Sequence, residues 1–113
     1  MIYYFRVYTD ALEGKNESGT LSVEEPVIVG SNVTFTFCPA NYTEPHTLQL
    51  QYDDGDGQEY KNVYFERLYN DANNRSLGFY IPNAEETLNG KNIYIKYNED
   101  LGPDVAIKMC KYC

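Results

Sequence analysis

The feature that most constrains the fold of this chain is an alternation of apolar and polar residues with a period of two. Val33, Phe35 and Phe37 alternate with threonines, and Ile93 and Ile95 flank a tyrosine in the same way. Successive side chains of a strand point to opposite faces, so each run can bury one face and expose the other. Because half-buried strands are typical of antiparallel sheets, the chain is predicted to be all-β.

Turn-forming residues separate these runs. The breaks lie at 30–32, 53–57, 70–74 and 98–104, and the last of them contains Gly102-Pro103. Glycine, proline, asparagine and aspartate each favour turns for a backbone reason. The spacing predicts about seven to eight short strands in an antiparallel sandwich or small barrel.

One short helical turn is predicted at 83–90, before the strand that contains Ile93. Asn83 can cap the first turn and Gly90 can close the last one. The stretch 64–69 is ambiguous between helix and strand, and we interpret it as a strand.

Length and charge limit the class of protein. The 113 residues are expected to form a single domain, 1–113, with an N-terminal strand or arm at 1–10 and a sandwich at 19–113. Nine Lys and Arg residues against 17 Asp and Glu residues give a formal charge of −8, which a nucleic-acid backbone would repel. No apolar run approaches the roughly 20 residues that cross a bilayer, so membrane insertion is not expected.

The order of these features resembles that of an immunoglobulin-like sandwich. The segment 21–29, which Pro26 interrupts, resembles a split first strand, and 33–38 resembles the second strand. The runs at 93–97 and 105–110 resemble the closing hairpin. The resemblance implies an immunoglobulin-like antiparallel β-sandwich, a fold that hosts many unrelated functions.

Within that group, the stretch 52–57 reads Tyr-Asp-Asp-Gly-Asp-Gly and resembles the turn of polycystic-kidney-disease-type repeats. Its carboxylates Asp53, Asp54 and Asp56 offer the oxygen ligands that calcium prefers. The alternative is an acidic hairpin turn in which the glycines supply positive φ angles. The acidic loop at 98–104 is expected at the opposite end of the domain, where it cannot share ligands with this turn.

A small zinc-binding protein is an alternative, because three sulfurs and one nitrogen could bind the metal. The candidate ligands are Cys38, Cys110, Cys113 and His46. In the expected sandwich, strand directions put Cys38 and Cys110 at opposite ends of a strand about 17–20 Å long. That separation is too great for one metal site or for a disulfide between them. We therefore expect free thiols and no cofactor, with a disulfide between Cys110 and Cys113 as the alternative.

An enzyme is not expected. His46 is the only histidine that could act as a general base near neutral pH. No serine or cysteine lies in a nucleophile elbow, and no glycine-rich loop could hold a phosphate.

The first residues alternate like a strand and lack the basic start and apolar block of a secretory signal. We therefore expect synthesis in the cytoplasm of the host cell. Immunoglobulin-like modules recur on the capsids and tails of tailed phages, and the chain resembles such a decoration or accessory protein. Its expected location is the virion, and its expected partners are other virion structural proteins or copies of itself.

The expected contact with these partners is the N-terminal arm, which would add a strand to a sheet edge. Its predicted partner-binding residues are Ile2, Tyr3, Tyr4, Phe5 and Tyr8. The alternative is a secreted or cell-surface recognition module that binds a glycan or a protein, since tyrosine-lined sheet faces can stack on sugars.

Overall fold

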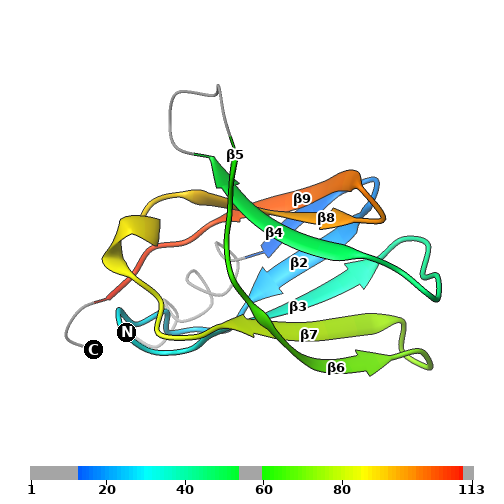
Figure 1. Cartoon of the computed structure of the whole chain (residues 1–113), viewed down its shortest axis with the longest axis horizontal. Helices are drawn as coiled ribbons and strands as arrows, with labels where there is room; N and C mark the ends of the chain where they lie inside the picture. Colours follow the sequence, from blue (N-terminus) through cyan, green and yellow to red (C-terminus); the bar gives the residue numbers. More distant parts are fainter. Residues whose placement is uncertain (1–12, 54–59, 111–113) are drawn as a thin grey trace, which may run out of the picture.

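The computed structural model describes residues 13–53 and 60–110, so the predicted arm at 1–10 lies outside the described residues. The described part holds nine strands and one short 3-10 helix (Figure 1). The elements are β1 Glu13–Asn16, β2 Gly19–Val23, β3 Val33–Pro39, β4 Leu48–Asp53, β5 Tyr60–Asn62, β6 Glu66–Asp71, β7 Ser76–Ile81, η1 Glu86–Leu88, β8 Asn92–Tyr97 and β9 Asp100–Ala106.

The strands form two sheets, with the orders β1-β2-β3-β7-β6 and β5-β4-β8-β9. Every pair of neighbouring strands in them is antiparallel. The two sheets form the layers of a sandwich (Figure 1), which confirms the predicted fold class. Nine strands rather than eight are present in the described residues because the 13–23 stretch forms a hairpin and 60–62 forms a short edge strand.

The alternating apolar residues supply the core between the sheets. Val33, Phe35 and Phe37 of β3 are buried, and so are Ile93 and Ile95 of β8. Phe35 stacks on a phenylalanine of β7 with ring centroids 5.3 Å apart. Burying one such side chain contributes roughly 1.5–3 kcal/mol, so this pattern accounts for much of the stability of the sandwich.

The first strand is split, as the interruption at Pro26 predicts. β2 ends at Val23, and beyond Pro26 the residue Ile28 forms a parallel bridge with Cys110, outside the named strands. The Cys110 amide donates to the Val27 carbonyl at 2.8 Å. The segment after Pro26 is therefore hydrogen-bonded to Cys110, at the C-terminal end of the described chain.

The predicted helical turn is present, but its cap is not the predicted one. The 3-10 helix η1 follows Glu85, which makes no side-chain capping bond. Asn83 instead adopts a positive φ of 49°, a conformation that asparagine tolerates better than most residues. Gly90, with a φ of 80°, closes the turn as predicted.

The last strand begins earlier than predicted. β9 starts at Asp100, so the turn before it consists only of Asn98 and Glu99, which have positive φ angles of 53° and 70°. The prediction of a loop at 98–104 is wrong, because Gly102 and Pro103 belong to β9. They lie beside a register shift at the edge of the sheet, where a proline is tolerated.

Candidate interaction surface

The large apolar side chains that remain exposed are concentrated on one stretch of the chain. Among the described residues these are Tyr60, Tyr64, Leu68, Tyr69 and Leu101. Four of these five side chains lie between positions 60 and 69, and we call this segment the 60–69 strip. Exposed apolar patches are candidates for protein contact, so this strip is the first candidate site.

The strip is exposed because it runs along the open edge of the sandwich. β5 and β6 are edge strands of different sheets, and the chain crosses from one sheet to the other between them (Figure 1). Val63 and Phe65 turn inward and pack against the core. Their inward orientation leaves Tyr64 pointing outward, with 69% of its surface exposed.

The hydroxyl of Tyr64 is held in place by a carboxylate. It donates to Glu66 Oε2 at 3.1 Å, and the Tyr80 hydroxyl donates to Glu66 Oε1 at 2.7 Å. These hydrogen bonds are the largest cause that raises the pKa of both tyrosines. Tyr64 is thus an exposed ring in a fixed orientation, which reduces the entropy lost when a partner binds.

Tyr69 is positioned by a glycine on the neighbouring strand. A Cβ atom added to Gly78 would lie 2.2 Å from Cε2 of Tyr69, so the ring lies directly over the glycine. The register of β6 on β7 shifts between Arg67 and Tyr69, at Leu68. A bulge of this kind re-aims side chains, and here both Leu68 and Tyr69 remain exposed.

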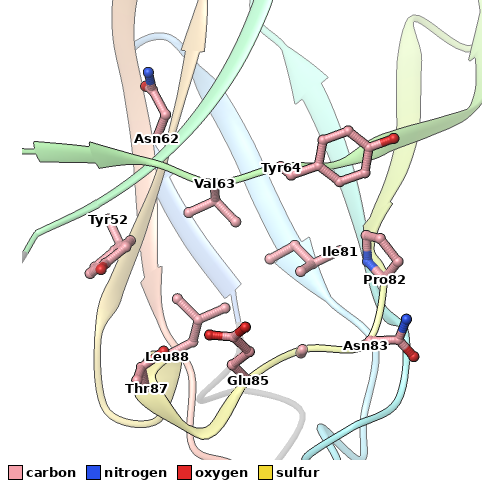
Figure 2. Close-up of a pocket in the computed structure, with 11 residues that line it drawn as sticks. Tyr52, Asn62, Val63, Tyr64, Ile81, Pro82, Asn83, Glu85, Thr87 and Leu88 are labelled. Atoms are coloured by element: carbon pink, nitrogen blue, oxygen red, sulfur yellow. The ribbon is translucent and has the colours of Figure 1, made fainter.

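A cleft of about 300 Å³ opens beside Tyr64, between the 60–69 strip and the segment that leads into η1 (Figure 2). Figure 2 shows Val63 pointing across the cleft toward Leu88 and Glu85, while Tyr64 lies near Ile81 and Pro82 at the rim. The residues that line it are Tyr52, Asn62, Val63, Tyr64, Ile81, Pro82, Asn83, Ala84, Glu85, Thr87 and Leu88.

A second aromatic surface lies on the outer face of the β5-β4-β8-β9 sheet. Tyr60 and Tyr94 stack with ring centroids 5.0 Å apart and an interplanar angle of 22°. Beside them, Gln51 Nε2 donates to Asn62 Oδ1 at 3.0 Å. Burial is the largest cause that raises the pKa of Tyr94, and the nearby Asp104 carboxylate is the next. Flat rings next to amides can hold a sugar or a polar protein surface.

His46, the predicted candidate base and zinc ligand, ties a loop to a strand. Its Nδ1 donates to the Thr43 carbonyl at 2.9 Å, and Arg67 Nη1 donates to its Nε2 at 3.2 Å. Its ring also lies 5.1 Å from that of Tyr97. Both ring nitrogens are therefore engaged in holding the 40–47 loop against β6.

A network of polar groups extends from His46 along the same loop. The Tyr42 hydroxyl donates to the Glu44 carboxylate, and Asn70 Nδ2 donates to Glu44 Oε2 at 3.3 Å. The hydrogen bond to Glu44 is the largest cause that raises the pKa of Tyr42 to about 12. The carboxylate thus joins the loop to β6 a second time.

Cys38 and Cys110 lie far apart, as the strand directions predict. Cys38 is an exposed free thiol near the end of β3, opposite Thr20, whereas Cys110 pairs with Ile28 before β3 begins. Cys110 is disulfide-bonded, so the prediction of free thiols is wrong for this residue. A sulfur in a disulfide offers no thiolate to zinc. Cys113 lies outside the described residues.

The predicted calcium ligands are only partly described. Asp53 ends β4, while Asp54 and Asp56 lie outside the described residues. The turn at Asn98 and Glu99 lies at the other end of the sheet, because Tyr97 pairs with Leu48 and Ile93 with Tyr52. Residues 13–53 and 60–110 contain no group of three His, Cys, Asp or Glu side chains that could hold a metal ion.

The sequence did not identify the 60–69 strip or the cleft. It predicts a strand at 64–69, and β6 is a strand at Glu66–Asp71, but the sequence did not predict the exposure of that strand. One signal was available: Leu68 and Tyr69 are adjacent, so in a regular strand one of them must face away from the core.

No helix within the described ranges is long and apolar enough to cross a membrane. A comparison of the chain with protein-family models finds no match, and a comparison with curated proteins also finds none.

Proposed function

We propose that this chain is a non-enzymatic interaction protein that binds a protein partner through the 60–69 strip. The observation that carries the proposal is the concentration of exposed apolar side chains there, with Tyr64 and Tyr69 held by Glu66 and Gly78. Interfaces are enriched in tyrosine, which buries a large area at a small cost in conformational entropy.

We further propose that the sandwich is immunoglobulin-like. The order β2-β3-β7-β6 in one sheet and β4-β8-β9 in the other resembles the two sheets of that fold. The interruption at Pro26, followed by the parallel bridge between Ile28 and Cys110, supports the same assignment.

The setting that we propose is a virion, in which the chain is a capsid or tail accessory protein. The phage-like resemblance of the sequence, its acidic charge and its apolar N-terminal segment support this setting. The predicted arm, with Ile2, Tyr3, Tyr4, Phe5 and Tyr8, would supply a second contact. Removing residues 1–9 should then abolish incorporation into particles, and unchanged incorporation would refute the role of the arm.

The role of the strip is tested by incorporation into particles. We expect Tyr64→Ser combined with Leu68→Ser to lower the amount of chain in gradient-purified particles about tenfold, because central apolar contacts dominate binding. Leu101→Ser is the matched control, since Leu101 is similarly exposed but lies on β9. Surface changes alter stability little, which circular dichroism can verify. Equal incorporation of the double variant and the unaltered chain would refute the proposal.

A second candidate function is glycan recognition on the outer face of the β5-β4-β8-β9 sheet. The stacked pair Tyr60 and Tyr94 and the neighbouring amides of Gln51 and Asn62 favour it. Binding to a glycan array that Tyr94→Ala abolishes would support this function, and binding that Tyr94→Ala leaves unchanged would argue against this face.

A further inference from the structure

We infer that the cleft beside the 60–69 strip receives a lysine or arginine side chain of the protein partner. The inference rests on the proposed function and names the chemistry of its partner. Tyr64 belongs both to the strip and to the rim of the cleft, so a protein that covers the strip lies over the cleft opening (Figure 2).

The buried floor of the cleft is apolar, whereas the surface that an occupant could touch combines polar and apolar groups. Ile81 and Leu88 are only 4% and 6% exposed, and Val63 is partly buried against the core. Figure 2 shows Val63 and Leu88 extending toward each other across the opening. A mixed lining of this kind suits a long cationic side chain, whose methylene stem can contact Val63 while its charged head reaches a polar group.

The charge of the cleft selects a cation. Among the described residues that line it, Glu85 is the only charged one, and its side chain makes no capping bond to η1. Glu85 is exposed at the lower edge of the cleft, where its carboxylate lies beside Leu88 (Figure 2). An anionic ligand would meet this carboxylate, and the lining residues that the structure describes include no compensating cation.

The net charge of the whole chain also favours a basic partner. A formal charge of −8 attracts a basic partner surface and repels an acidic one. Nearby, Glu66 orients Tyr64 and adds a second carboxylate outside the rim. A basic side chain can also lie against the Tyr64 ring, since cations are attracted to the faces of aromatic rings.

A protein side chain fits better than a free small molecule. The volume of about 300 Å³ lies at the lower limit of ligand-binding cavities, which enclose most of their ligand. Because the cleft opens onto an exposed strip, an occupant that is anchored by a larger contact surface binds more tightly than one that binds alone, so a free peptide should bind weakly but measurably at millimolar concentration.

The probe for this inference is the peptide acetyl-Gly-Lys-Gly-amide, titrated into the full-length chain and followed by amide NMR shifts. We expect concentration-dependent shifts at Val63, Glu85 and Leu88. Glu85→Gln should weaken binding about three- to fivefold, the range expected for an exposed ion pair. Glu99→Gln removes the same charge at the opposite end of the sheet and should leave the affinity unchanged.

Two further peptides separate charge from apolar contact. Acetyl-Gly-norleucine-Gly-amide keeps the stem without the charge and should bind more weakly than the lysine peptide. Glu85→Lys should abolish lysine-peptide binding and allow acetyl-Gly-Glu-Gly-amide to bind. Equal affinities for the lysine and norleucine peptides, or shifts that Glu85→Gln and Glu99→Gln reduce alike, would overturn the inference.

Failure of the cleft and failure of the strip give different results. If the lysine peptide produces no shifts in the cleft, the inference about the cleft is refuted. If particles nevertheless incorporate the Glu85→Gln variant of the chain but not the Tyr64→Ser, Leu68→Ser variant, the strip retains its proposed role. If the Tyr64→Ser, Leu68→Ser variant is incorporated as well as the unaltered chain, the proposed function itself is refuted.

Discussion

At the scale of single residues, the most informative groups are tyrosines whose hydroxyls donate to carboxylates. Tyr42 donates to Glu44, while Tyr64 and Tyr80 share Glu66. In each case the nearby carboxylate disfavours the tyrosinate, so the pKa rises. These pairs fix the orientation of rings at the surface, which burial alone would not do.

The Tyr42 pair makes a prediction at alkaline pH. Its pKa in the folded chain is about 12, above the ordinary value of 10.0. The stabilisation that it provides is therefore complete below pH 10 and is lost as the pH rises from 10 toward 12. Titration of chains with ¹³Cζ-labelled tyrosine, followed by NMR, should show Tyr42 titrating late.

Two variants check the cause of this shift. Glu44→Gln should return the pKa of Tyr42 toward 10, because it removes the charged acceptor. Glu85→Gln should not change it, since Glu85 follows Ile81, which pairs with Val33 at the start of β3, whereas the 40–47 loop follows the end of β3. A Tyr42 pKa that is the same in the unaltered chain and in Glu44→Gln would contradict the assigned hydrogen bond.

At the scale of elements, hydrophobic alternation was enough to predict the central strands. β3 and β8 carry Phe35, Phe37, Ile93 and Ile95 at alternate positions, and tertiary packing agrees with that local pattern. The start of β9 was not predictable in this way. Gly102-Pro103 indicates a turn in isolation, and only its place at a sheet edge makes a strand compatible with it.

Close contact between the sheets at one edge depends on Gly14 in β1. A Cβ atom there would lie 1.7 Å from the carbonyl oxygen of Asp104 in β9, so only glycine fits without movement of the backbone. Gly14→Ala should lower the free energy of unfolding by about 1–3 kcal/mol, as overpacking does.

Urea unfolding measures this effect, with Lys15→Ala as the matched control. Lys15 is exposed in the same strand, so its loss should change stability by no more than about 0.5 kcal/mol. Equal stability of Gly14→Ala and Lys15→Ala would show that β1 does not pack against β9 as described.

At the scale of the whole molecule, the two-layer architecture followed from the sequence, whereas the candidate site did not. Whether Tyr64, Leu68 and Tyr69 are exposed depends on which strand lies at the edge of which sheet, and alternation does not specify that order. Hydrophobic alternation also could not predict that Cys110 is disulfide-bonded, since the pattern does not specify the redox state of a sulfur.

The whole molecule also has distinct surfaces with different chemistry. The open edge carries Tyr64, Leu68 and Tyr69 of the 60–69 strip and the cleft with Glu85, while Tyr60, at the start of the strip, stacks on Tyr94 on the outer face of the β5-β4-β8-β9 sheet. The acidic charge of the chain favours a basic partner at any of these surfaces, so charge alone does not choose between them.

Site-specific photo-crosslinking tests the central claim most directly. A benzophenone side chain is placed at position 64, 68 or 101 of the full chain, and the cross-linked species from purified particles are identified by mass spectrometry. The account predicts that positions 64 and 68 capture the same protein and that position 101 does not. Capture of that protein from position 101, with none from positions 64 and 68, would contradict it.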